Sequence, residues 1–415
     1  MNFDGVEHYS VLEYQYKRLM IKFASSAVTV TQRWDSRSFS VILTSGDRTA
    51  IATGRGSVEE ALEEAKRKLP YSVTPYPVRF PKDDRKILRK SVDSSIMESL
   101  KDPSKLVSNL MNKFEVETAG AVDLVYVKRK LITSGGFQGE EEGTYTTAYF
   151  RAFHGERSGS WAWSGNTLDL NSINDAVKRA SHYSQIDGQI NVDDGKYNVI
   201  LSPMVFSNLM NVVGWMSSAM AVELGNSIFM DSKIGSKVGS SSFTLSDSPR
   251  SQYFGTWEFD DEGVQTYNKP IVNNGVLSTL LYNRTLGERN GGGSTGNAGW
   301  IFPRPWSLEV GAGSVDEGSL HSGGNLLFNN NWYTRMQNYV EGTFSTVGRD
   351  AIVVLKDGKE VGVAKRLRIA DSIRRIMENV EVLSKQRYPI RWWEVETPTL
   401  SPFVLVKDVH VTRAS

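Results

Sequence analysis

The hydrophobic pattern near the start of the chain changes from a helical period to a strand period. Residues up to about 22 fit a helix. Three strand-like runs of β-branched and aromatic residues follow, at residues 27–33, 38–43 and 49–53. Ser57, three residues before Glu60, forms a capping box that opens an amphipathic helix over residues 61–69. The pattern predicts a helix, three short strands and a second helix.

A similar order of elements recurs in residues 121–183. Strand-like runs cover residues 121–130, 145–153 and 159–163, and a helical period covers residues 173–183. The recurrence predicts an internal duplication of one unit of strands and helix.

The polar, turn-rich residues 191–195 separate this first part of the chain from one of different character. A chain of 415 residues exceeds what one hydrophobic core usually serves, so we expect two domains. We place a domain of mixed strands and helices at residues 1–190 and a β-rich domain at residues 191–415. The predicted fold class is therefore α+β.

The second part begins with a helix that is apolar on nearly every face. Ser202 is a capping residue, Pro203 suits the first helical position, and the helix is predicted over residues 204–224, with Gly225 ending it. Such a central helix must be buried in a core or under another subunit. Polar residues interrupt it and no basic cluster flanks it, so we reject a membrane span. Its candidate core or interface residues are Trp215, Met216 and Met220.

Strand and turn signals dominate the chain after this helix. Asn274-Gly275 predicts a hairpin over residues 271–277, and Asp357-Gly358 predicts another over residues 353–359. The second domain is thus predicted to be β-rich around a central buried helix.

Composition excludes several kinds of chemistry. Lys and Arg total 48 against 47 Asp and Glu, so no overall field draws the chain to nucleic acid or anionic lipid. The absence of cysteine excludes disulfides and thiolate ligands. The five histidines are scattered, so we expect no metal site built by this chain alone. The first residues show no secretory signal, and we expect a cytoplasmic protein.

Two local features each allow a purely structural interpretation and a functional one. Residues 66–90 are rich in Lys, Arg and Pro; a solvated loop is the preferred interpretation, and a patch for nucleic acid or a partner is the alternative. Asp260, Asp261 and Glu262 could hold a cation or the amino end of a peptide, although an acidic turn is preferred. Ser294 lacks the preceding strand and following helix of a hydrolase elbow, so we assign it no catalysis.

Several segments of the second part, in this order, resemble the TldD/PmbA family, once called modulators of DNA gyrase. They are Asp260-Asp261-Glu262-Gly263-Val264, Asn274-Gly275-Val276-Leu277, Ser294-Thr295-Gly296-Asn297-Ala298, and residues 324–327 and 332–342. The family implies a heteromeric protease in which the TldD subunit carries a His-Glu-x-x-x-His motif on the central helix. That subunit binds a metal and cleaves unfolded or small peptides, whereas TldE or PmbA lacks the motif.

The corresponding helical segment of this chain, residues 211–220, contains no histidine, so the resemblance is to the TldE-like branch. It implies a non-catalytic subunit that shapes a shared peptide chamber, while a TldD-like partner supplies zinc or a similar divalent metal. No cofactor and no catalytic residue are expected in this chain, and a homodimer is expected when the partner is absent. The candidate substrate contacts on the family-like segments are Asp261, Glu262, Ser294 and Asn297.

Two other functions remain open from the sequence. A stand-alone protein that binds peptide or nucleic acid through residues 66–90 would bind phosphates with a steep salt dependence. A weak metallopeptidase with ligands drawn from His154, Glu156, His321 or the acidic turn would lose activity to chelators.

Overall fold

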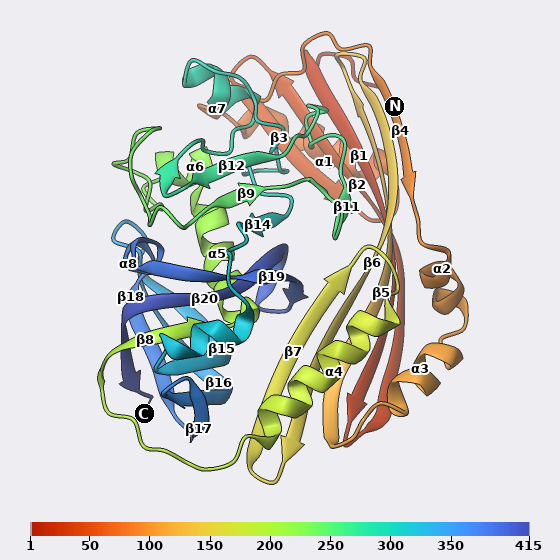
Figure 1. The fold of residues 1–415 in the computed structure, drawn as a ribbon. Coiled ribbons are helices and arrows are strands. Elements are labelled where there is room, and N and C mark those ends of the chain that lie inside the picture. The colour runs from red at the N-terminus through yellow and green to blue at the C-terminus, as the bar shows by residue number, and fades with distance from the viewer. Residues whose placement is uncertain (1, 415) are drawn as a thin grey trace.

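The N-terminal half of the chain forms one seven-stranded sheet in the computed structural model, which describes residues 2–414 (Figure 1). Its strands are β1 (His8–Ala24), β2 (Ala27–Ser45), β3 (Arg48–Gly54), β4 (Lys86–Ser91), β5 (Glu117–Thr133), β6 (Gln138–His154) and β7 (Arg157–Gly165). The strand order is β3-β2-β1-β5-β6-β4, and β7 also pairs with β6. This sheet forms one long wall of the molecule, with the C-terminal half on its inner side.

The helix predicted up to residue 22 is wrong, because this segment is strand β1. Leu19, Ile21 and Phe23 are buried and alternate with more exposed residues, which is the period of a strand rather than of a helix. Strand β1 pairs with β2 on one side and with β5 on the other. Pairing with residues about a hundred positions away overrides the local helical pattern.

The predicted duplication is visible in the order of the elements. Strands β1, β2 and β3 precede helix α1 (Val58–Lys68), and strands β5, β6 and β7 precede helix α4 (Leu170–Gln185). The predicted cap of α1 is present, since the Ser57 hydroxyl accepts the Glu60 N–H at 3.2 Å. Because β1 lies beside β5, the two copies meet at the centre of the sheet.

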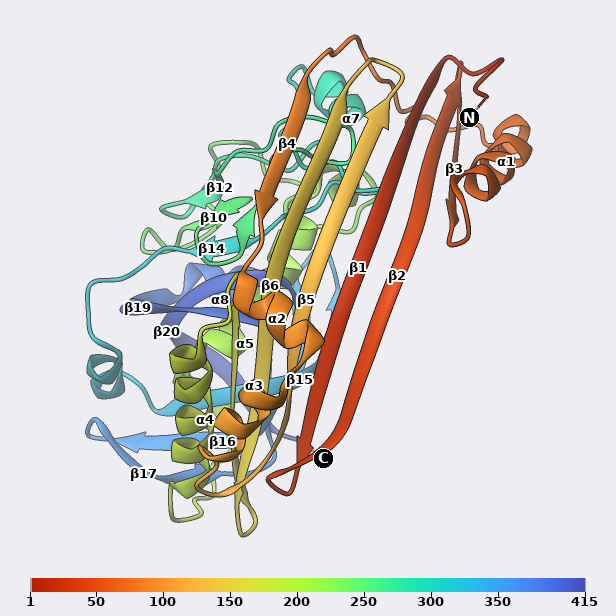
Figure 2. The same ribbon diagram turned by 90° about the vertical axis from the view of Figure 1, so that its right-hand side faces the viewer.

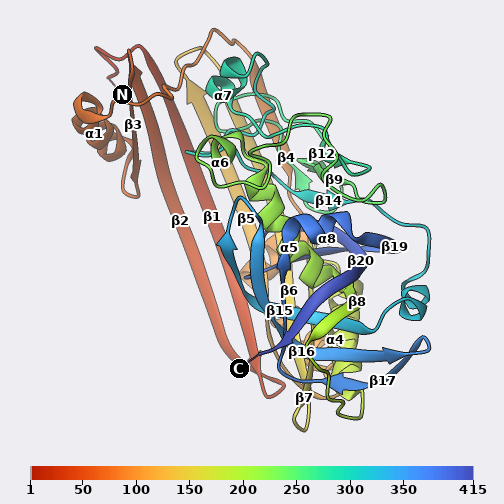
Figure 3. The same cartoon turned by 90° about the vertical axis from the view of Figure 1, so that its left-hand side faces the viewer.

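The two faces of this sheet have different neighbours. Helices α2 (Ser94–Lys101) and α3 (Ser104–Met111) cover the outer face, where Leu19 and Ile21 pack with Ile96 (Figure 2). Figure 3 shows the C-terminal half against the inner face, beside the long β1–β2 hairpin. Successive residues of a strand point to opposite faces, so the residues of β1 that alternate with this buried set face inward.

The C-terminal half is built on an eleven-stranded sheet. Its strands are β8 (Gly195–Leu201), β9 (Leu245–Asp247), β12 (Lys269–Asn273), β13 (Val276–Leu277), β14 (Leu308–Val310), β15 (Leu326–Asn338), β16 (Thr343–Lys356), β17 (Lys359–Ala364), β18 (Leu367–Ser372), β19 (Val380–Trp392) and β20 (Val395–Arg413). Strand β8 pairs with both β15 and β20, so β20, β18, β16, β15 and β8 close into a ring. A separate small ribbon joins β10 (Arg250–Ser251) to β11 (Gly255–Thr256).

Both predicted hairpins are confirmed. Strands β12 and β13 are joined through Asn274 and Gly275, which have φ of 47° and 77°. Strands β16 and β17 are joined through Asp357 and Gly358, which have φ of 49° and 74°. Positive φ at both central residues is the geometry that Asn-Gly and Asp-Gly favour in a two-residue hairpin turn.

The central helix is shorter than predicted, because it divides into α5 (Pro203–Met216) and α6 (Ala219–Glu223). At the break, the Ala219 N–H donates to the Leu281 carbonyl at 2.9 Å, and the Leu281 N–H donates to the Ser217 carbonyl at 2.8 Å. A distant segment thus satisfies the backbone groups that a continuous helix would pair internally. The remaining helices are α7 (Arg284–Arg289), α8 (Ile373–Glu378) and the 3₁₀ turns η1 (Leu69–Tyr71) and η2 (Glu317–Ser322).

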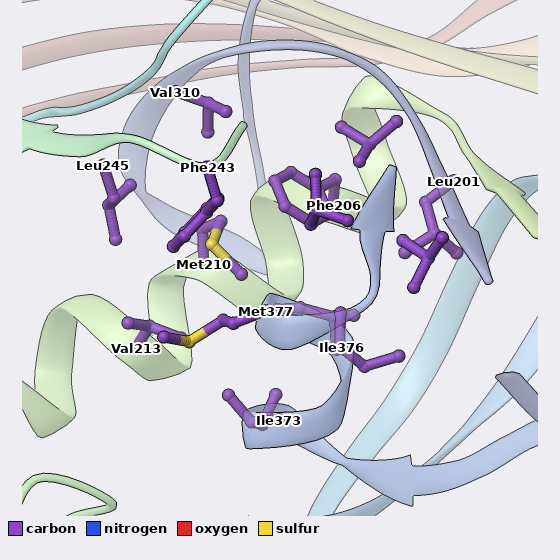
Figure 4. Close-up of a cluster of buried hydrophobic side chains, with 14 of the residues drawn as sticks. Leu201, Phe206, Met210, Val213, Phe243, Leu245, Val310, Ile373, Ile376 and Met377 are labelled. Carbon is purple, nitrogen blue, oxygen red and sulfur yellow. The ribbon is translucent and has the colours of Figure 1, made fainter. Parts of the chain in front are cut away.

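Helix α5 is buried in the core of the C-terminal half. Phe206, Met210 and Val213 project from it among Phe243 and Met377, and all five side chains are fully buried (Figure 4). This packing explains why the sequence of α5 is apolar around most of its circumference.

The two halves also share a hydrophobic cluster, in which the ring of Trp161 of the first sheet lies 5.8 Å, centroid to centroid, from that of Phe403 of the second. The predicted boundary residues 191–195 fall at the junction between α4 and β8. The division into two domains at residue 190 stays a prediction. Within residues 2–414, none of the helices combines the length and apolar character required to span a membrane.

Candidate functional site

A cavity of about 610 Å³ lies between the inner face of the first sheet and the C-terminal half. A second hollow of about 470 Å³ follows the same sheet face, and the two share Tyr145, Arg391 and Trp392. We call the two hollows together the groove. Residues that line its larger part include Tyr14, Arg129, Tyr145, Trp257, Asp261, Arg304, Trp306, Arg391, Trp392, Glu396 and Thr397.

Strand register places the groove residues of the first sheet. Tyr14 of β1 lies opposite Arg129 of β5, and Arg129 lies opposite Glu141 of β6. Directly opposed residues of neighbouring strands share a face, so these three side chains form a row on the inner face. Two of them, Tyr14 and Arg129, line the cavity.

Arg129 is buried and joins the two halves of the chain. Its guanidinium lies 2.6 Å from Glu141 Oε1 and 2.7 Å from Asp261 Oδ1. Three aromatic rings, those of Trp257, Phe259 and Trp306, surround the same guanidinium at 5.2–5.6 Å. Breaking a buried ion pair is costly, so this network ties the first sheet to the acidic turn of the C-terminal half at the wall of the larger cavity.

Aromatic rings form much of the groove wall. The ring of Trp392 stacks on Tyr149 with centroids 5.0 Å apart. The Arg391 guanidinium lies 4.4 Å from the centroid of Tyr145, and the Arg304 guanidinium lies 4.6 Å from that of Trp306. Such rings offer large apolar surfaces, while the guanidinium groups above them keep donors for hydrogen bonds.

The acidic turn is buried, and its carboxylates are used within the chain. Asp260 accepts the N–H groups of Glu262, Val264 and Ala298, each at 2.9 Å. Burial raises the pKa of Asp260 to about 6, and burial together with Asp260 raises the pKa of Glu262 to about 8. Glu262 accepts the Arg284 N–H at 3.0 Å. Of these three carboxylates only Asp261 lines the groove, and its contact with substrate stays a prediction, as does that of Glu262.

Ser294 and Asn297 are not among the residues that line the groove. The Ser294 hydroxyl donates to the Tyr282 carbonyl at 3.2 Å. Asn297 is fully buried; its amide donates to Asp247 Oδ2 at 2.6 Å, and its oxygen accepts from Lys269 Nζ at 3.0 Å. Their direct contacts are with the protein itself, and a role toward substrate stays a prediction.

Helix α5 lies directly behind the groove wall. The Asn211 amide donates to the carbonyl of Thr397, a groove residue, at 3.1 Å. Met216 is buried and Met220 is 7% exposed, whereas Trp215 is 40% exposed and lies against Tyr339 with ring centroids 5.5 Å apart. Met216 and Met220 are therefore core residues of this chain, and Trp215 presents an aromatic surface to its outside.

The residue types along α5 do not fit a metal site. Zinc in proteins is bound by imidazole, carboxylate or thiolate, and residues 203–216 contain none of these groups. Across residues 2–414, no group of three or more His, Asp or Glu side chains is arranged to hold a metal ion. The alternative ligands are also separated, since Glu156 lines one hollow with Arg151 and His321 lines another with His182.

Many cations of the basic segment, residues 66–90, are paired with carboxylates from inside and outside the segment. Carboxylates lie within 4.0 Å of six of its cations: Lys66, Lys68, Lys82, Arg85, Arg89 and Lys90. This pairing weakens the field that a phosphate backbone would meet.

The arginines and aromatic residues of the groove are what the sequence reasoning missed. Arg129, Arg304 and Arg391 are far apart along the chain, and Tyr14 falls in the segment predicted as a helix. A strand period over residues 8–24 would have placed Tyr14 and Tyr16 on one face. No local signal links this face to Arg304 or Arg391.

Comparison with known proteins agrees with this architecture. Residues 194–413 match the family model described as the PmbA/TldA metallopeptidase C-terminal domain. A metalloprotease of Methanocaldococcus jannaschii is 28% identical over 210 residues, which cover 45% of this chain and 46% of the relative. The metalloprotease PmbA homolog of Haemophilus influenzae is 33% identical over 105 residues, 24% of this chain and 23% of the relative. The chain therefore spans about half, or less, of the length of these relatives.

Two solved structures share the fold over nearly the whole chain. TldE from Thermococcus kodakarensis has a TM-score of 0.85 and 16% identity, covering 98% of this chain and 97% of its own. A Thermotoga maritima protein named for modulation of a DNA gyrase has a TM-score of 0.81 and 19% identity, covering 98% and 96%. With the family match over residues 194–413, we conclude that this chain belongs to the PmbA/TldD metallopeptidase family.

Proposed function

We propose that this chain is the non-catalytic, TldE-like subunit of a two-component metalloprotease, and that it shapes the chamber in which small or unfolded peptides are held. A TldD-like partner subunit supplies the divalent metal in this proposal, and the complex works in the cytoplasm. The observation that carries the proposal is the composition of α5, the helix on which the family's metal motif is expected. It offers amides, hydroxyls and apolar groups but no metal ligand.

The surroundings of α5 support the same proposal. The polar amides on the helix are already engaged: Asn211 donates to Thr397 and Thr399, and Asn208 donates to the Glu394 carbonyl at 2.7 Å. A side chain added at Gly214 would meet Leu308 Cδ1 at 2.9 Å. The helix is therefore packed as a structural support for the groove wall, and we assign no metal chemistry to it.

The groove has the features that an extended peptide needs. Its larger cavity, about 610 Å³, is within the size range of ligand sites in proteins. Aromatic rings along the wall can receive side chains of varied sequence, because stacking and apolar contact depend little on side-chain identity. Binding of this kind suits a protein that holds peptides without strict sequence preference.

The proposal is tested by reconstitution. The purified chain is assayed for bound metal by elemental analysis and for cleavage of an unstructured peptide, alone and with a TldD-type homologue. We expect substoichiometric metal and no cleavage from the lone chain, and faster cleavage by the partner when the chain is added. Stoichiometric metal with chelator-sensitive cleavage by the lone chain would overturn the proposal, as would a partner whose cleavage rate is unchanged.

The exposed ring of Trp215 offers a second test of the partnership. Buried tryptophans at the centre of an interface commonly contribute about 2 kcal/mol or more to binding. We expect Trp215→Ala to weaken association with the partner by about that amount, measured by calorimetry. Tyr71→Ala is the matched control, because Tyr71 is an aromatic residue that is 87% exposed and lies on η1, away from α5. Equal affinity of the two variants would remove Trp215 from the subunit contact.

A further inference from the structure

Two arginines of the groove have no charge partner in the described part of the chain. Within residues 2–414, no carboxylate oxygen lies within 4.0 Å of the guanidinium of Arg304 or Arg391. Their guanidinium groups lie over the rings of Trp306 and Tyr145. Arg129 differs in this respect, since Glu141 and Asp261 neutralise it. Arg304 and Arg391 thus bring positive charge and free donors to the cavity wall.

Tyr14 shares the larger cavity with three arginines. Burial raises the pKa of Tyr14 to about 12, and the charges of Arg129, Arg391 and Arg304 all act against this rise. Tyr14, Arg129, Arg304 and Arg391 all line the larger cavity, so the three guanidinium groups share this cavity with the phenol. Tyr14 is therefore a neutral donor or acceptor at physiological pH, placed among these cations.

A further donor of the cavity wall lacks an acceptor. Trp392 lines the groove and is 6% exposed, and its Nε1 has no hydrogen-bond partner within residues 2–414. An unmade hydrogen bond of a buried donor costs about 1–3 kcal/mol, so an acceptor on a bound ligand would be favourable there. The wall that carries Arg391 therefore combines a cation with an unsatisfied neutral donor.

We propose that Arg304 and Arg391 receive a carboxylate of the bound peptide, so that the groove selects peptides by a negative charge as well as by apolar side chains. The inference rests on the proposed function for the peptide nature of the ligand. Guanidinium groups pair with carboxylates through two parallel hydrogen bonds, which gives direction as well as attraction. The carboxylate comes from the carboxyl terminus of the peptide or from an acidic side chain.

A nucleic acid is a less favoured ligand than a peptide with a carboxylate. Asp261 and Glu396 line the same cavity, and Glu396 is exposed without a cation within 4.0 Å among the described residues. A chain of phosphates would meet these carboxylates, whereas a single carboxylate carries less charge for them to repel. Binding of a fluorescein-labelled ten-residue oligothymidylate to the groove, tighter than that of the peptide, would contradict this preference.

The test measures binding to the lone full-length chain by fluorescence anisotropy. One fluorescein-labelled peptide, Gly-Ala-Phe-Ala-Val, is used with a free carboxyl terminus and as the amide. We expect the amide to bind the chain about tenfold more weakly, the effect of losing one charge-assisted pair. A third peptide, the amide with an internal Glu, separates the two sources. Recovered affinity identifies an acidic side chain as the ligand group, and unrecovered affinity identifies the carboxyl terminus.

Substitutions assign the effect to the two arginines. We expect Arg391→Gln and Arg304→Gln each to bring the acid-to-amide affinity ratio close to one, and Arg391→Lys to keep part of it. Glu396→Gln should strengthen binding of the free acid, because a like charge near the site is removed. Arg349→Gln is the matched control. Its guanidinium also lies over a ring, 4.1 Å from Trp332, without a carboxylate within 4.0 Å in the described chain, but outside the groove.

The possible results separate this inference from the proposed function. Equal affinity of the wild-type chain for the acid, the amide and the amide with an internal Glu overturns the inference, and this result needs no variant that could misfold. An unchanged ratio in both glutamine variants, or Arg391-dependent oligothymidylate binding tighter than that of the peptide, overturns it as well. A lone chain that prefers the acid but leaves the partner's cleavage rate unchanged supports the inference and removes the proposed function.

Discussion

The three arginines that line the larger cavity differ in what surrounds their charge. Arg129 is buried between Glu141 and Asp261, at 2.6 and 2.7 Å, and inside three aromatic rings. Arg304 and Arg391 lie over single rings, and no carboxylate of the described chain neutralises them. The first arrangement completes the structure by itself, whereas the second leaves charge for a ligand. The same residue type is thus paired within the protein in one case and, in our proposal, available to a ligand in the other.

The largest effect on stability is expected from substitution of Arg129, the buried arginine. Arg129→Met leaves the carboxylates of Glu141 and Asp261 buried without a cation, and should lower the free energy of unfolding by about 3–5 kcal/mol. Urea denaturation monitored by circular dichroism measures this loss. Arg391→Gln is the matched control, expected to stay within about 0.5 kcal/mol of the wild type. Similar losses of unfolding free energy in both variants would show that Arg129 and Arg391 do not differ in the way described.

A pH dependence of stability should follow from the buried acidic turn. The pKa of Glu262 is raised from 4.5 to about 8 by burial and by Asp260. The folded chain then holds a proton that the unfolded chain has released, so stability is full below about pH 4.5 and declines as pH rises toward about 8.

We expect the wild type to lose about 2 kcal/mol of unfolding free energy between pH 6 and pH 8.5, since each pKa unit corresponds to about 1.4 kcal/mol. Glu262→Gln, which remains neutral, should flatten this part of the profile. A profile that rises over this range in the wild type would contradict the buried, protonated state of Glu262.

Asn297 and Ser294 give a smaller test, which compares a buried side chain in a hydrogen-bond network with a half-buried one. Asn297→Ala removes the partner of Asp247 and Lys269 in a fully buried site and should cost about 1–3 kcal/mol of stability. Ser294→Ala, a change at a half-buried hydroxyl with one carbonyl acceptor, should cost less than about 1 kcal/mol. Thermal unfolding of the two variants compares them. A larger loss from Ser294→Ala would reverse the assignment of roles.

The smallest expected change in stability comes from substitution of Arg304 and Arg391. Arg304→Gln and Arg391→Gln together should leave the unfolding free energy within about 1 kcal/mol of the wild type, because neither side chain has an ion pair to lose. Their effect should be confined to ligand affinity. A double variant that unfolds readily would mean that these arginines support the fold, and denaturant titration decides the matter.

Local signals predicted the parts of the fold that depend on a few neighbouring residues. Asn274-Gly275 and Asp357-Gly358 form their turns because positive φ is needed there, and Ser57 caps its helix through one hydroxyl. Strand β1 was missed because its pairing with β5 lies outside any local window. The break between α5 and α6 was missed for the same reason, since Leu281 satisfies its backbone.

The candidate site was harder to predict than the fold. The family-like segments pointed to Asp261, which lines the groove, and to Asn297, which is buried in its own network. The arginines that face the cavity come from β5, from the segment before β14 and from β19, so only the folded chain brings them together. Spacing along a sequence predicts sites that lie on a single helix or loop, whereas this groove is built from several separate segments.

The closed ring of strands has a consequence for how the chain acquires its structure. Strand β8 lies between β15 and β20, and its pairing with β20 joins residues 195–201 to residues 404–411. During synthesis, the edge of β8 that pairs with β20 therefore stays unpaired until about two hundred further residues have been added. Such late closure slows folding and exposes a strand edge to other nascent chains, so we expect chaperone dependence to concentrate in this half of the molecule.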